Sequence, residues 1–291
     1  MCDNGLQRKG DIVIDLHFHS IFSDGDATPE ELVALGRKQK LTAMALTDHD
    51  TTEGVPRFLA AGAAEGMVVC SGVEISAEYN PGTMHVLGYF LDTENPALVD
   101  ALVNIRDGRR IRNLKIVDQL RALGCAITFE ECAAEAGGDV VGRPHIARVL
   151  QRKGYVKNKD EAFEKYLAKG KPGYVPRFRL LPADCVTIIR NAGGVAVLAH
   201  PATLDLKPAA LEALVADLAA AGLGGIEVYY SEHQDEQTRQ YAALAETFGL
   251  VATGGTDYHG RLTPAITLGR GFGGLRIPDA AFEQLKTRAG R

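Results

Sequence analysis

The sequence has few cysteines, and their placement excludes two common uses of that residue. Five of them are scattered along 291 residues without a CxxC pair, at Cys2, Cys70, Cys125, Cys132 and Cys185. This pattern argues against both a disulfide framework and a zinc ribbon. Scattered thiols in odd number are typical of a reducing compartment, so a cytoplasmic protein is expected.

Long apolar runs are missing as well. No stretch approaches the roughly 20 apolar residues that a transmembrane helix needs. The first ten residues, MCDNGLQRKG, lead directly into a short strand-like run rather than into a signal-peptide pattern. We therefore expect neither a signal peptide nor an anchor, and no membrane as a partner.

Positive charge is in short supply. Lysine and arginine number 32 against 37 aspartates and glutamates, which gives a formal net charge of -5 at pH 7. Binding of long duplex nucleic acid depends on many cationic side chains at phosphates, so this class of partner is excluded. Small anionic substrates stay compatible with the composition if metal ions supply positive charge locally.

Strand-like and helix-like segments alternate over most of the chain. Runs such as IVIDLHFHS (12–20), TAMALTDHD (42–50) and GGVAVLAHP (193–201) are continuously apolar, as strands covered on both faces are. Between them lie helix signals, for example the capping-box pattern of Thr28 and Glu31. The alternation predicts an α/β fold with a parallel sheet or barrel.

Residues 105–190 differ from the rest of the chain in sequence pattern, because strand-like runs are absent and helix signals dominate. Thr128 and Glu131 form another capping box, and Pro144 marks a helix start. One helix is expected to bury a stripe formed by Leu114, Val117, Leu120 and Leu123. We predict a small helical insertion at 105–190 that divides a barrel into a first part, 1–104, and a second part, 191–291.

Residues that bind metal ions follow nearly every strand-like run. Histidine spacing at the first run places both imidazoles on one face of a strand. In a parallel barrel the carboxyl ends of the strands meet at one mouth, so residues far apart in sequence converge there. The candidate ligands are His17, His19, Asp24, His49, Glu74, His85, His200, Asp257 and His259.

This set is too large for a single ion. With four to six ligands per ion and some shared, two or three divalent ions are expected, with Glu74 as a plausible bridge. Imidazole and carboxylate donors without a thiolate favour Mn²⁺, with Zn²⁺ and Fe²⁺ as alternatives. The competing interpretation is that these are ordinary polar residues at strand ends, and it is stronger for His145 and His233, which lie outside the set.

At these residues the sequence resembles the PHP family, named after polymerase and histidinol phosphatase domains. The resemblance rests on DLHFHSIFSDG, TDHD, GVEIS, HVLGY, AHP and TDYH, in this order. It implies a distorted (β/α)7 barrel and a two- or three-metal centre that hydrolyses phosphate esters. The nine candidate ligands match the family's motifs, and Asp24, His200 and Asp257 are expected to be catalytic.

The insertion carries three basic clusters in an acidic protein, and they predict a second site for phosphate. Guanidinium groups bind phosphate oxygens bidentately, and the helix start in GRPH adds backbone donors. The expected substrate-binding residues are Arg106, Arg109, Arg110, Asn113, Arg143, His145 and Arg177. For Arg112 and Arg179 a solvated helix face is the favoured interpretation.

A single barrel with this insert resembles the nucleotide phosphatases of the family. The implied activity is hydrolysis of the 3′-phosphate of a 3′,5′-nucleoside bisphosphate, or trimming of short RNA from the 5′ end, by attack of a metal-activated hydroxide. A proton donor for the leaving group is not singled out among His200, His233 and water. The alternatives are a histidinol-phosphate-type phosphatase and a non-catalytic metal-binding regulatory protein.

Overall fold

The strands of the protein form two sheets. The computed structural model describes residues 13–136, 141–176 and 178–291. One sheet has the order β1-β2-β3 and the other the order β4-β5-β6-β7-β8. Their bounds are β1 Val13–Asp15, β2 Leu41–Ala45, β3 Val68–Cys70, β4 Gly72–Ala77, β5 Met84–Tyr89, β6 Val195–Leu198, β7 Gly225–Tyr230 and β8 Val251–Gly255.

The two sheets join at both edges. Beyond β1 and β8, the backbone N–H of Asp257 donates to the carbonyl of His17 at 2.7 Å. Between β2 and β4, the N–H of Asp50 donates to the carbonyl of Glu74 at 2.9 Å. Only Ser71 separates β3 from β4, so the two act as one broken strand. The mixed α/β fold is therefore consistent with a distorted barrel.

The expectation of an all-parallel sheet is wrong for two of the strand pairs. β5 runs antiparallel to both β4 and β6, whereas the other pairs are parallel. The reason for the first pair is the length of its connection. Only residues 78–83 join β4 to β5, and a parallel crossover needs a dozen residues or more.

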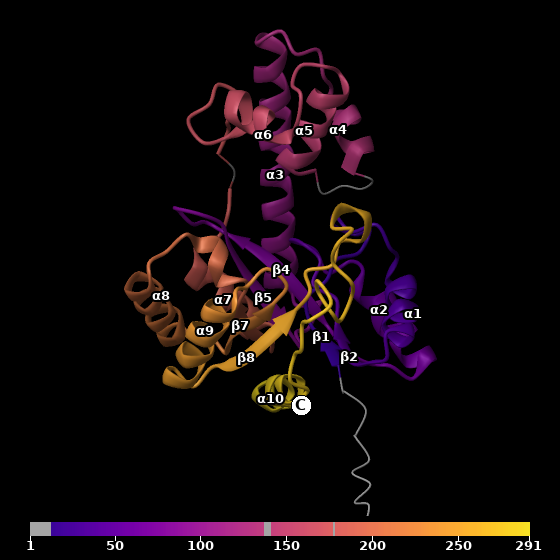
Figure 1. Cartoon of the computed structure of the whole chain (residues 1–291), viewed down its shortest axis with the longest axis vertical. Coiled ribbons are helices and arrows are strands. Elements are labelled where there is room, and N and C mark those ends of the chain that lie inside the picture. Colours follow the sequence, from indigo (N-terminus) through magenta and orange to yellow (C-terminus); the bar gives the residue numbers. More distant parts are fainter. Residues whose placement is uncertain (1–12, 137–140, 177) are drawn as a thin grey trace, which may run out of the picture.

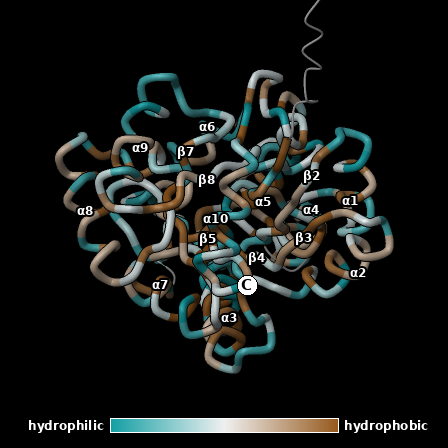
Figure 2. Tube along the Cα trace, turned by 90° about the horizontal axis from the view of Figure 1, so that it is seen from below, coloured by the Kyte–Doolittle hydropathy of each residue, from teal (hydrophilic) through white to brown (hydrophobic). Residues whose placement is uncertain are grey.

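Helices cover the barrel on its outside and close one end (Figure 1). α1 (Pro29–Lys38) and α2 (Val55–Glu65) pack on the first sheet, and α7 (Pro182–Asn191), α8 (Pro208–Ala220) and α9 (Asp235–Thr247) on the second. α10 (Ala280–Arg288) lies below the barrel and packs Phe282 and Leu285 against its interior. Seen from below, apolar segments gather around α10 and β5 (Figure 2). The opposite, carboxyl end of the strands stays open for a site.

Local helix signals behave as predicted. Thr28 caps α1, accepting from the N–H of Glu31, whose carboxylate accepts from the N–H of Thr28 in return. The same reciprocal pair joins Thr128 and Glu131 at α4 (Phe129–Ala136). In the described residues, no helix is both long and apolar enough to cross a membrane.

α3 (Pro96–Ala122) connects two packed regions. Its first half contributes Leu98 and Ile105 to the core against the second sheet. Its second half packs with α4, α5 (Arg143–Arg152), α6 (Lys159–Ala162) and the π-helical turn Phe163–Leu167, and we call this region the helical cluster. Figure 1 shows the cluster above the open end of the barrel. The predicted boundary at 104/105 thus falls inside α3, and the division into domains stays a prediction.

The buried face of α3 also differs from the expected stripe. Val117 and Leu120 are buried, but Leu114 and Leu123 are 39% and 45% exposed. The expected residues are spaced by three, and each step of three residues falls about 60° short of a full helical turn. A series with this spacing therefore moves around the helix and leaves the contact face. The buried face contains Asn113 and Ile116 instead.

Candidate metal centre

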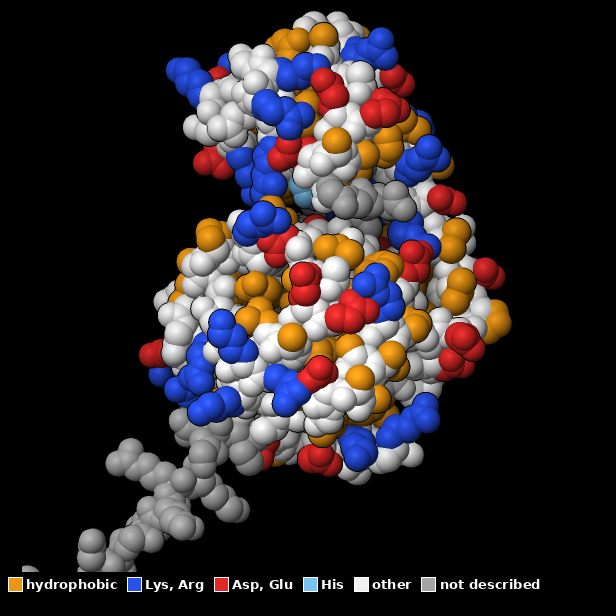
Figure 3. All heavy atoms as spheres, turned by 90° about the vertical axis from the view of Figure 1, so that its right-hand side faces the viewer, with side chains coloured by type: hydrophobic (Ala, Val, Ile, Leu, Met, Phe, Trp, Pro, Cys, Tyr) orange, Lys and Arg blue, Asp and Glu red, His pale blue; other side chains and the backbone are white. Residues whose placement is uncertain are grey.

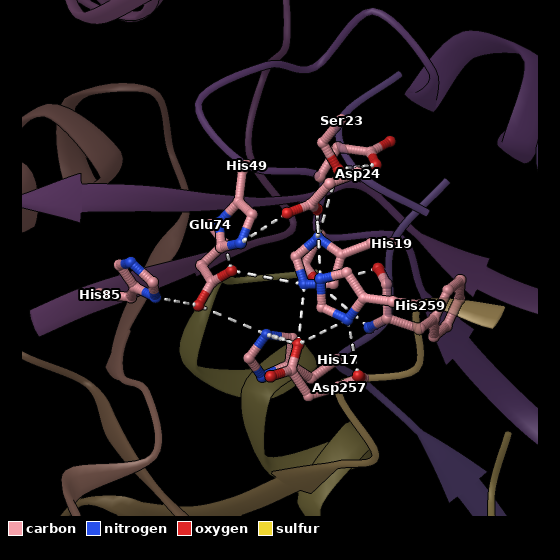
Figure 4. Close-up of polar contacts among 12 residues, drawn as sticks. His17, His19, Ser23, Asp24, His49, Glu74, His85, Asp257 and His259 are labelled. Atoms are coloured by element: carbon pink, nitrogen blue, oxygen red, sulfur yellow. Dashed lines mark hydrogen bonds and ion pairs between the residues drawn. The ribbon is translucent and has the colours of Figure 1, made fainter. Parts of the chain in front are cut away.

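The nine ligand candidates lie together at the open end of the barrel. Six of them follow strands: His17 and His19 come after β1, His49 after β2, His200 after β6, and Asp257 and His259 after β8. Glu74 lies within β4, and His85 lies at the amino end of β5, which reaches the open end of the barrel because this strand runs antiparallel to its neighbours. Asp24 reaches the same place from the loop after β1. Figure 4 shows the side chains of eight of them, all except His200, pointing toward one another from both sheets. The convergence predicted from strand ends is what the structure contains.

Glu74 occupies the middle of this group. Its Oε1 is 2.7 Å from Nδ1 of His85 and 3.0 Å from Nε2 of His200. Its Oε2 is 2.7 Å from Nδ1 of His49 and 3.4 Å from Nε2 of His19. A carboxylate whose two oxygens face different imidazoles has the geometry of a bridging ligand.

Two further carboxylates complete the cluster. Asp257 places Oδ1 2.9 Å from Nε2 of His19 and 3.3 Å from Nε2 of His17. Asp24 places Oδ1 3.1 Å from Nε2 of His259. Eight of the nine candidates form three overlapping groups of ligand atoms, each within 4.8 Å: His19, Asp24, His49 and His259; His17, His19, Glu74 and Asp257; and His49, Glu74 and His85. His200 is in none of these groups and joins the cluster through its contact with Glu74.

The imidazoles of the cluster divide into two groups by protonation. Against the effect of burial, neighbouring carboxylates raise the pKa of His17, His49, His200 and His259, so a bound cation would displace protons there, whereas the pKa of His19 and of His85 is lowered. Burial lowers the pKa of His19 to about 3 and that of His85 to about 4, so both imidazoles are neutral and keep a lone pair to donate. Burial alone would raise the pKa of Glu74, but His49, His85 and His17 hold it well below its usual range. Neutral imidazoles beside ionised carboxylates are the donor set that Zn²⁺, Mn²⁺ and Fe²⁺ bind.

Several buried atoms of the cluster also lack hydrogen bonds. Among the described residues these include Nε2 of His17, Nδ1 of His49, Oδ1 of Asp24 and Oε2 of Glu74. A buried polar atom without a hydrogen bond costs about 1–3 kcal/mol. Coordination to a cation would remove this cost, so the residues present fit a multinuclear metal centre.

Close approach of strands is built into the backbone of this region. A Cβ on Gly255 in β8 would overlap the Cβ of His17, two residues beyond β1, so only glycine allows the two segments to meet there. His200 and Asp257 both have positive φ, 22° and 55°. Such strain in non-glycine residues is typical of functional sites.

Other carboxylates support the ligand loops, and they were not singled out in the sequence. Asp48 accepts from the N–H and Oγ of Ser20 at 2.7 and 2.6 Å and from Oγ of Ser23, which holds the loop before Asp24. Asp15 accepts from Oγ of Thr256 at 2.6 Å, next to Asp257. The signal was available, since these acids adjoin the ligand histidines in DLH and TDHD.

A cavity of about 370 Å³ lies between the metal cluster and the helical cluster. On the barrel side it is lined by Asp24, His49, His85 and His259. On the other side it is lined by cations from helices and from the segment before α7: Arg109, Arg112, Arg143, Arg148, Lys159 and Arg179. Figure 3 shows this waist between the two regions, with Lys and Arg side chains along it. One cavity thus joins a metal-type and an anion-type surface.

The predicted substrate residues divide into three groups. Arg109, Arg143 and His145 line the cavity. Arg106 pairs with Glu53 at 3.0 Å, and Arg110 is exposed above the ring of Phe129. Asn113 is buried and donates to the carbonyl of Val141, so it holds the loop that leads to GRPH. Arg177 lies outside the described residues.

Two arginines expected on a solvated face line this cavity instead. Arg112 is only 6% exposed, and Nε of both Arg112 and Arg179 is buried without a hydrogen-bond partner among the residues that the structure describes. Burial, with the nearby guanidinium groups of Arg109, Arg143 and Arg179, lowers the pKa of Arg112 to about 9. Buried guanidinium groups with an N–H unsatisfied by the described residues favour an anionic ligand.

The two histidines considered as proton donors are placed differently. His200 belongs to the metal cluster, beside Glu74. The ring of His233 packs 5.0 Å from that of Tyr230 and 4.9 Å from that of Tyr241, and its Nδ1 bonds the carbonyl of Val228. His233, which follows β7, is therefore held by Val228 of that strand and by two tyrosine rings.

A mixed α/β barrel whose strand ends converge on buried imidazoles and carboxylates defines a class of protein that holds divalent metal ions. A family model described as the PHP domain matches residues 15–174. The chain belongs to the PHP family.

Individual relatives are similar over nearly the whole chain. A 3′,5′-nucleoside bisphosphate phosphatase of Chromobacterium violaceum is 39% identical over 247 residues, 84% of this chain and 87% of the relative. The 5′-3′ exoribonuclease Rnm of Salmonella typhimurium is 34% identical over 261 residues, 89% of each. The solved structure of an amidohydrolase from Chromobacterium violaceum, with bound sulfate and no metal, has a TM-score of 0.82 at 36% identity, covering 94% of this chain and 96% of that one.

Proposed function

We propose that this protein is a metal-dependent phosphoesterase that removes the 3′-phosphate of a 3′,5′-nucleoside bisphosphate. As a PHP phosphoesterase the chain is a hydrolase of phosphoester bonds, and its relatives include a phosphatase and a phosphodiesterase. The observation that carries the choice of substrate is the cavity with a metal-type wall and an arginine wall. A ligand with two phosphate groups would place one at the metal cluster and the other at the arginines.

On the barrel side, the cluster's histidines and carboxylates would hold two or three divalent ions. The ligand set, without thiolates, suits Mn²⁺, Zn²⁺ or Fe²⁺, and we propose Mn²⁺ first. Such ions, when bound, activate water and neutralise the phosphoryl oxygens. Asp24, Asp257 and His200 would be catalytic, because they bring carboxylate and imidazole groups to the reacting phosphate.

On the opposite side, the arginines would bind the phosphate that is not hydrolysed. Arg112 and Arg179 have buried guanidinium nitrogens without hydrogen bonds, which phosphate oxygens would satisfy. Nδ1 of His145 accepts from the N–H of Gly142 at 3.0 Å, so in the neutral ring the proton sits on Nε2, free to donate to an anion. Arg109 is held by Asp50, with which it forms a buried ion pair.

A second candidate activity is removal of nucleotides from the 5′ end of short RNA. The similarity to a 5′-3′ exoribonuclease over 89% of the chain favours it. The same arginines would then bind a phosphate of the chain end. In both cases the partner is a small phosphorylated nucleotide or a short oligonucleotide. A cytoplasmic location also stays a proposal, in keeping with the free, buried Cys70, Cys125, Cys132 and Cys185.

The test is phosphate release by Mn²⁺-loaded protein from 3′,5′-adenosine bisphosphate, with AMP, histidinol phosphate and a short 5′-phosphorylated RNA run in parallel. Preference for the bisphosphate over AMP is expected, because AMP occupies only one wall of the cavity. Preference for histidinol phosphate would overturn the nucleotide assignment. Hydrolysis of RNA alone would favour the second candidate, and silence on all four would favour a binding protein.

A further inference from the structure

β7 supplies none of the nine candidate ligands, yet two of its polar side chains face the metal centre. Glu227 is fully buried, and Tyr230 is 8% exposed. In a regular strand, residues three apart point to opposite faces. Here the register of β7 against β8 shifts between Glu227 and Tyr229. This irregularity turns both side chains to the inside of the barrel, as bulges next to active sites do.

Glu227 contacts two different ligand segments. Its Oε1 accepts from Nδ1 of His17 at 3.0 Å, and its Oε2 accepts from the backbone N–H of His200 at 2.7 Å. His200 is the residue with φ of 22°, a conformation that needs support from its surroundings. One buried carboxylate thus connects the end of β1 with the end of β6.

The contact with His17 decides which of its nitrogens is available. A carboxylate only accepts, so Nδ1 must carry the proton. Nε2, which lies 3.3 Å from Asp257 and 3.5 Å from Glu74, is then the donor atom toward a cation. A carboxylate behind a histidine is a common way to orient a metal-binding imidazole.

Tyr230 acts on the neighbouring carboxylate in a comparable way. Its hydroxyl donates to Oδ2 of Asp257 at 2.9 Å. The other oxygen, Oδ1, is the one that lies beside His17 and His19. The hydroxyl therefore occupies one oxygen and leaves its partner directed at the ligand group.

We propose that β7 is the positioning strand of the metal centre, in which Glu227 sets the tautomer of His17 and the backbone of His200, and Tyr230 sets the orientation of Asp257. Neither residue is a ligand itself. The proposal rests on the metal centre of the proposed function, but it is independent of the substrate.

The test is Mn²⁺ binding to metal-free, full-length protein, measured by isothermal titration calorimetry without substrate. In Glu227→Gln, the side chain offers one oxygen and one amide N–H to two donors, Nδ1 of His17 and the backbone N–H of His200. Either one of these donors loses its acceptor, or the proton of His17 moves to Nε2, and that nitrogen can then no longer bind a cation. Loss of such a supporting group typically lowers metal affinity about 10- to 100-fold, and we expect this range for Glu227→Gln and its lower end for Tyr230→Phe. Matched controls are Glu232→Gln, an exposed carboxylate after the same strand, and Tyr229→Phe, which lies in apolar packing.

The melting temperature of the metal-free variants separates positioning from a merely structural role. A structural role would lower that temperature and leave the affinity of the folded protein unchanged, and this result would overturn the proposal. Should Glu227→Gln fail to fold, Glu227→Asp replaces it, because its shorter carboxylate cannot reach both donors. A wild-type Mn²⁺ affinity of Glu227→Asp would also overturn the proposal. Wild-type protein that binds no divalent ion would instead refute the metal centre itself.

Discussion

The two sides of the central cavity differ in charge. We call the side lined by Asp24, His49, His85 and His259 the barrel wall, and the side lined by the arginines of the helices and of the segment before α7 the helical wall. On the barrel wall, buried histidines and carboxylates lie within 2.7–3.8 Å of each other and partly compensate one another's charge. On the helical wall, Arg112, Arg143 and Arg179 crowd together, and burial lowers the pKa of each. The barrel wall is set to receive cations and the helical wall to receive an anion.

The two walls also differ in how their side chains are held in position. Ligand residues on strand ends are held by a rigid sheet and by buried partners such as Asp48 and Glu227. The arginines come from α3, α5 and the segment before α7, whose relative positions depend on how the helical cluster packs. Substitutions on the two walls are therefore expected to affect different steps.

The largest effect is expected on the barrel wall, from Glu74→Gln. Glu74 approaches five imidazoles, and a neutral amide cannot bridge two cations. Loss of several kcal/mol of metal-derived stabilisation corresponds to a fall in kcat/KM of at least about 1000-fold. Steady-state kinetics with 3′,5′-adenosine bisphosphate measures it, and Glu78→Gln, an exposed carboxylate beyond the same strand, serves as control. Activity within tenfold of wild type would remove Glu74 from the centre.

On the helical wall, Arg112→Ala and Arg143→Ala are expected to raise KM for the bisphosphate and to change kcat less. A hydrogen bond to a charged group contributes about 1.5–3 kcal/mol, so kcat/KM falls roughly 10- to 100-fold. Hydrolysis of p-nitrophenyl phosphate, which has one phosphate, should stay unchanged. The exposed Arg110→Ala is the control on the same helix. Equal losses with both substrates would contradict separate roles for the walls.

A smaller effect of opposite sign is expected for stability. Arg112→Met should raise the melting temperature of the ligand-free protein, because it replaces a buried guanidinium, whose Nε has no hydrogen bond among the described residues, with an apolar chain of similar length. A gain of about 1 kcal/mol would shift Tm by roughly 2–4 °C in a chain of this size. Differential scanning calorimetry with and without AMP measures it, and AMP should stabilise wild type more than the variant. A lower Tm would mean that Arg112 already has its counter-charge.

The smallest effect is a pH dependence of the metal-free barrel wall. Burial alone would lower the pKa of His49 and His259, but Glu74 and Asp24 raise that of His49 to about 9, and Asp24 and Asp257 raise that of His259 to about 10. A raised histidine pKa stabilises the fold below the unfolded value of 6.5 and loses this contribution as pH rises through the folded value. Thermal melts between pH 6 and 10 should show falling Tm, less so in His49→Gln. An identical slope in the variant would contradict the assignment.

Much of the barrel wall was predictable, because each ligand is tied to a local pattern. His17, His49 and His200 follow apolar runs whose strand character is visible in the sequence, and strand ends of one barrel meet at one mouth. The capping boxes at Thr28 and Thr128 likewise depend on contacts within four residues. The direction of β5 was mispredicted, since apolar runs do not reveal whether neighbours are parallel.

The helical wall was predictable only in part. Arg109, Arg143 and His145 line the cavity as expected, whereas Arg106 and Arg110 do not, although all five lie in basic, helix-rich segments. Charge alone does not say which side of a helix is covered. Arg112 was placed in solvent for the same reason, and the structure buries it on the face of α3 that carries Asn113 and Ile116.

By itself, the sequence determined which residues can bind metal and at which strand ends they stand, because these properties depend on residue type and short-range periodicity. Tertiary structure decided the antiparallel course of β5, the side of α3 that faces the cavity, and the irregularity that turns Glu227 and Tyr230 of β7 inward. These features arise from packing between segments far apart in the chain. The free energy of such packing depends on two contacting surfaces together, so a single stretch of sequence does not reveal these features.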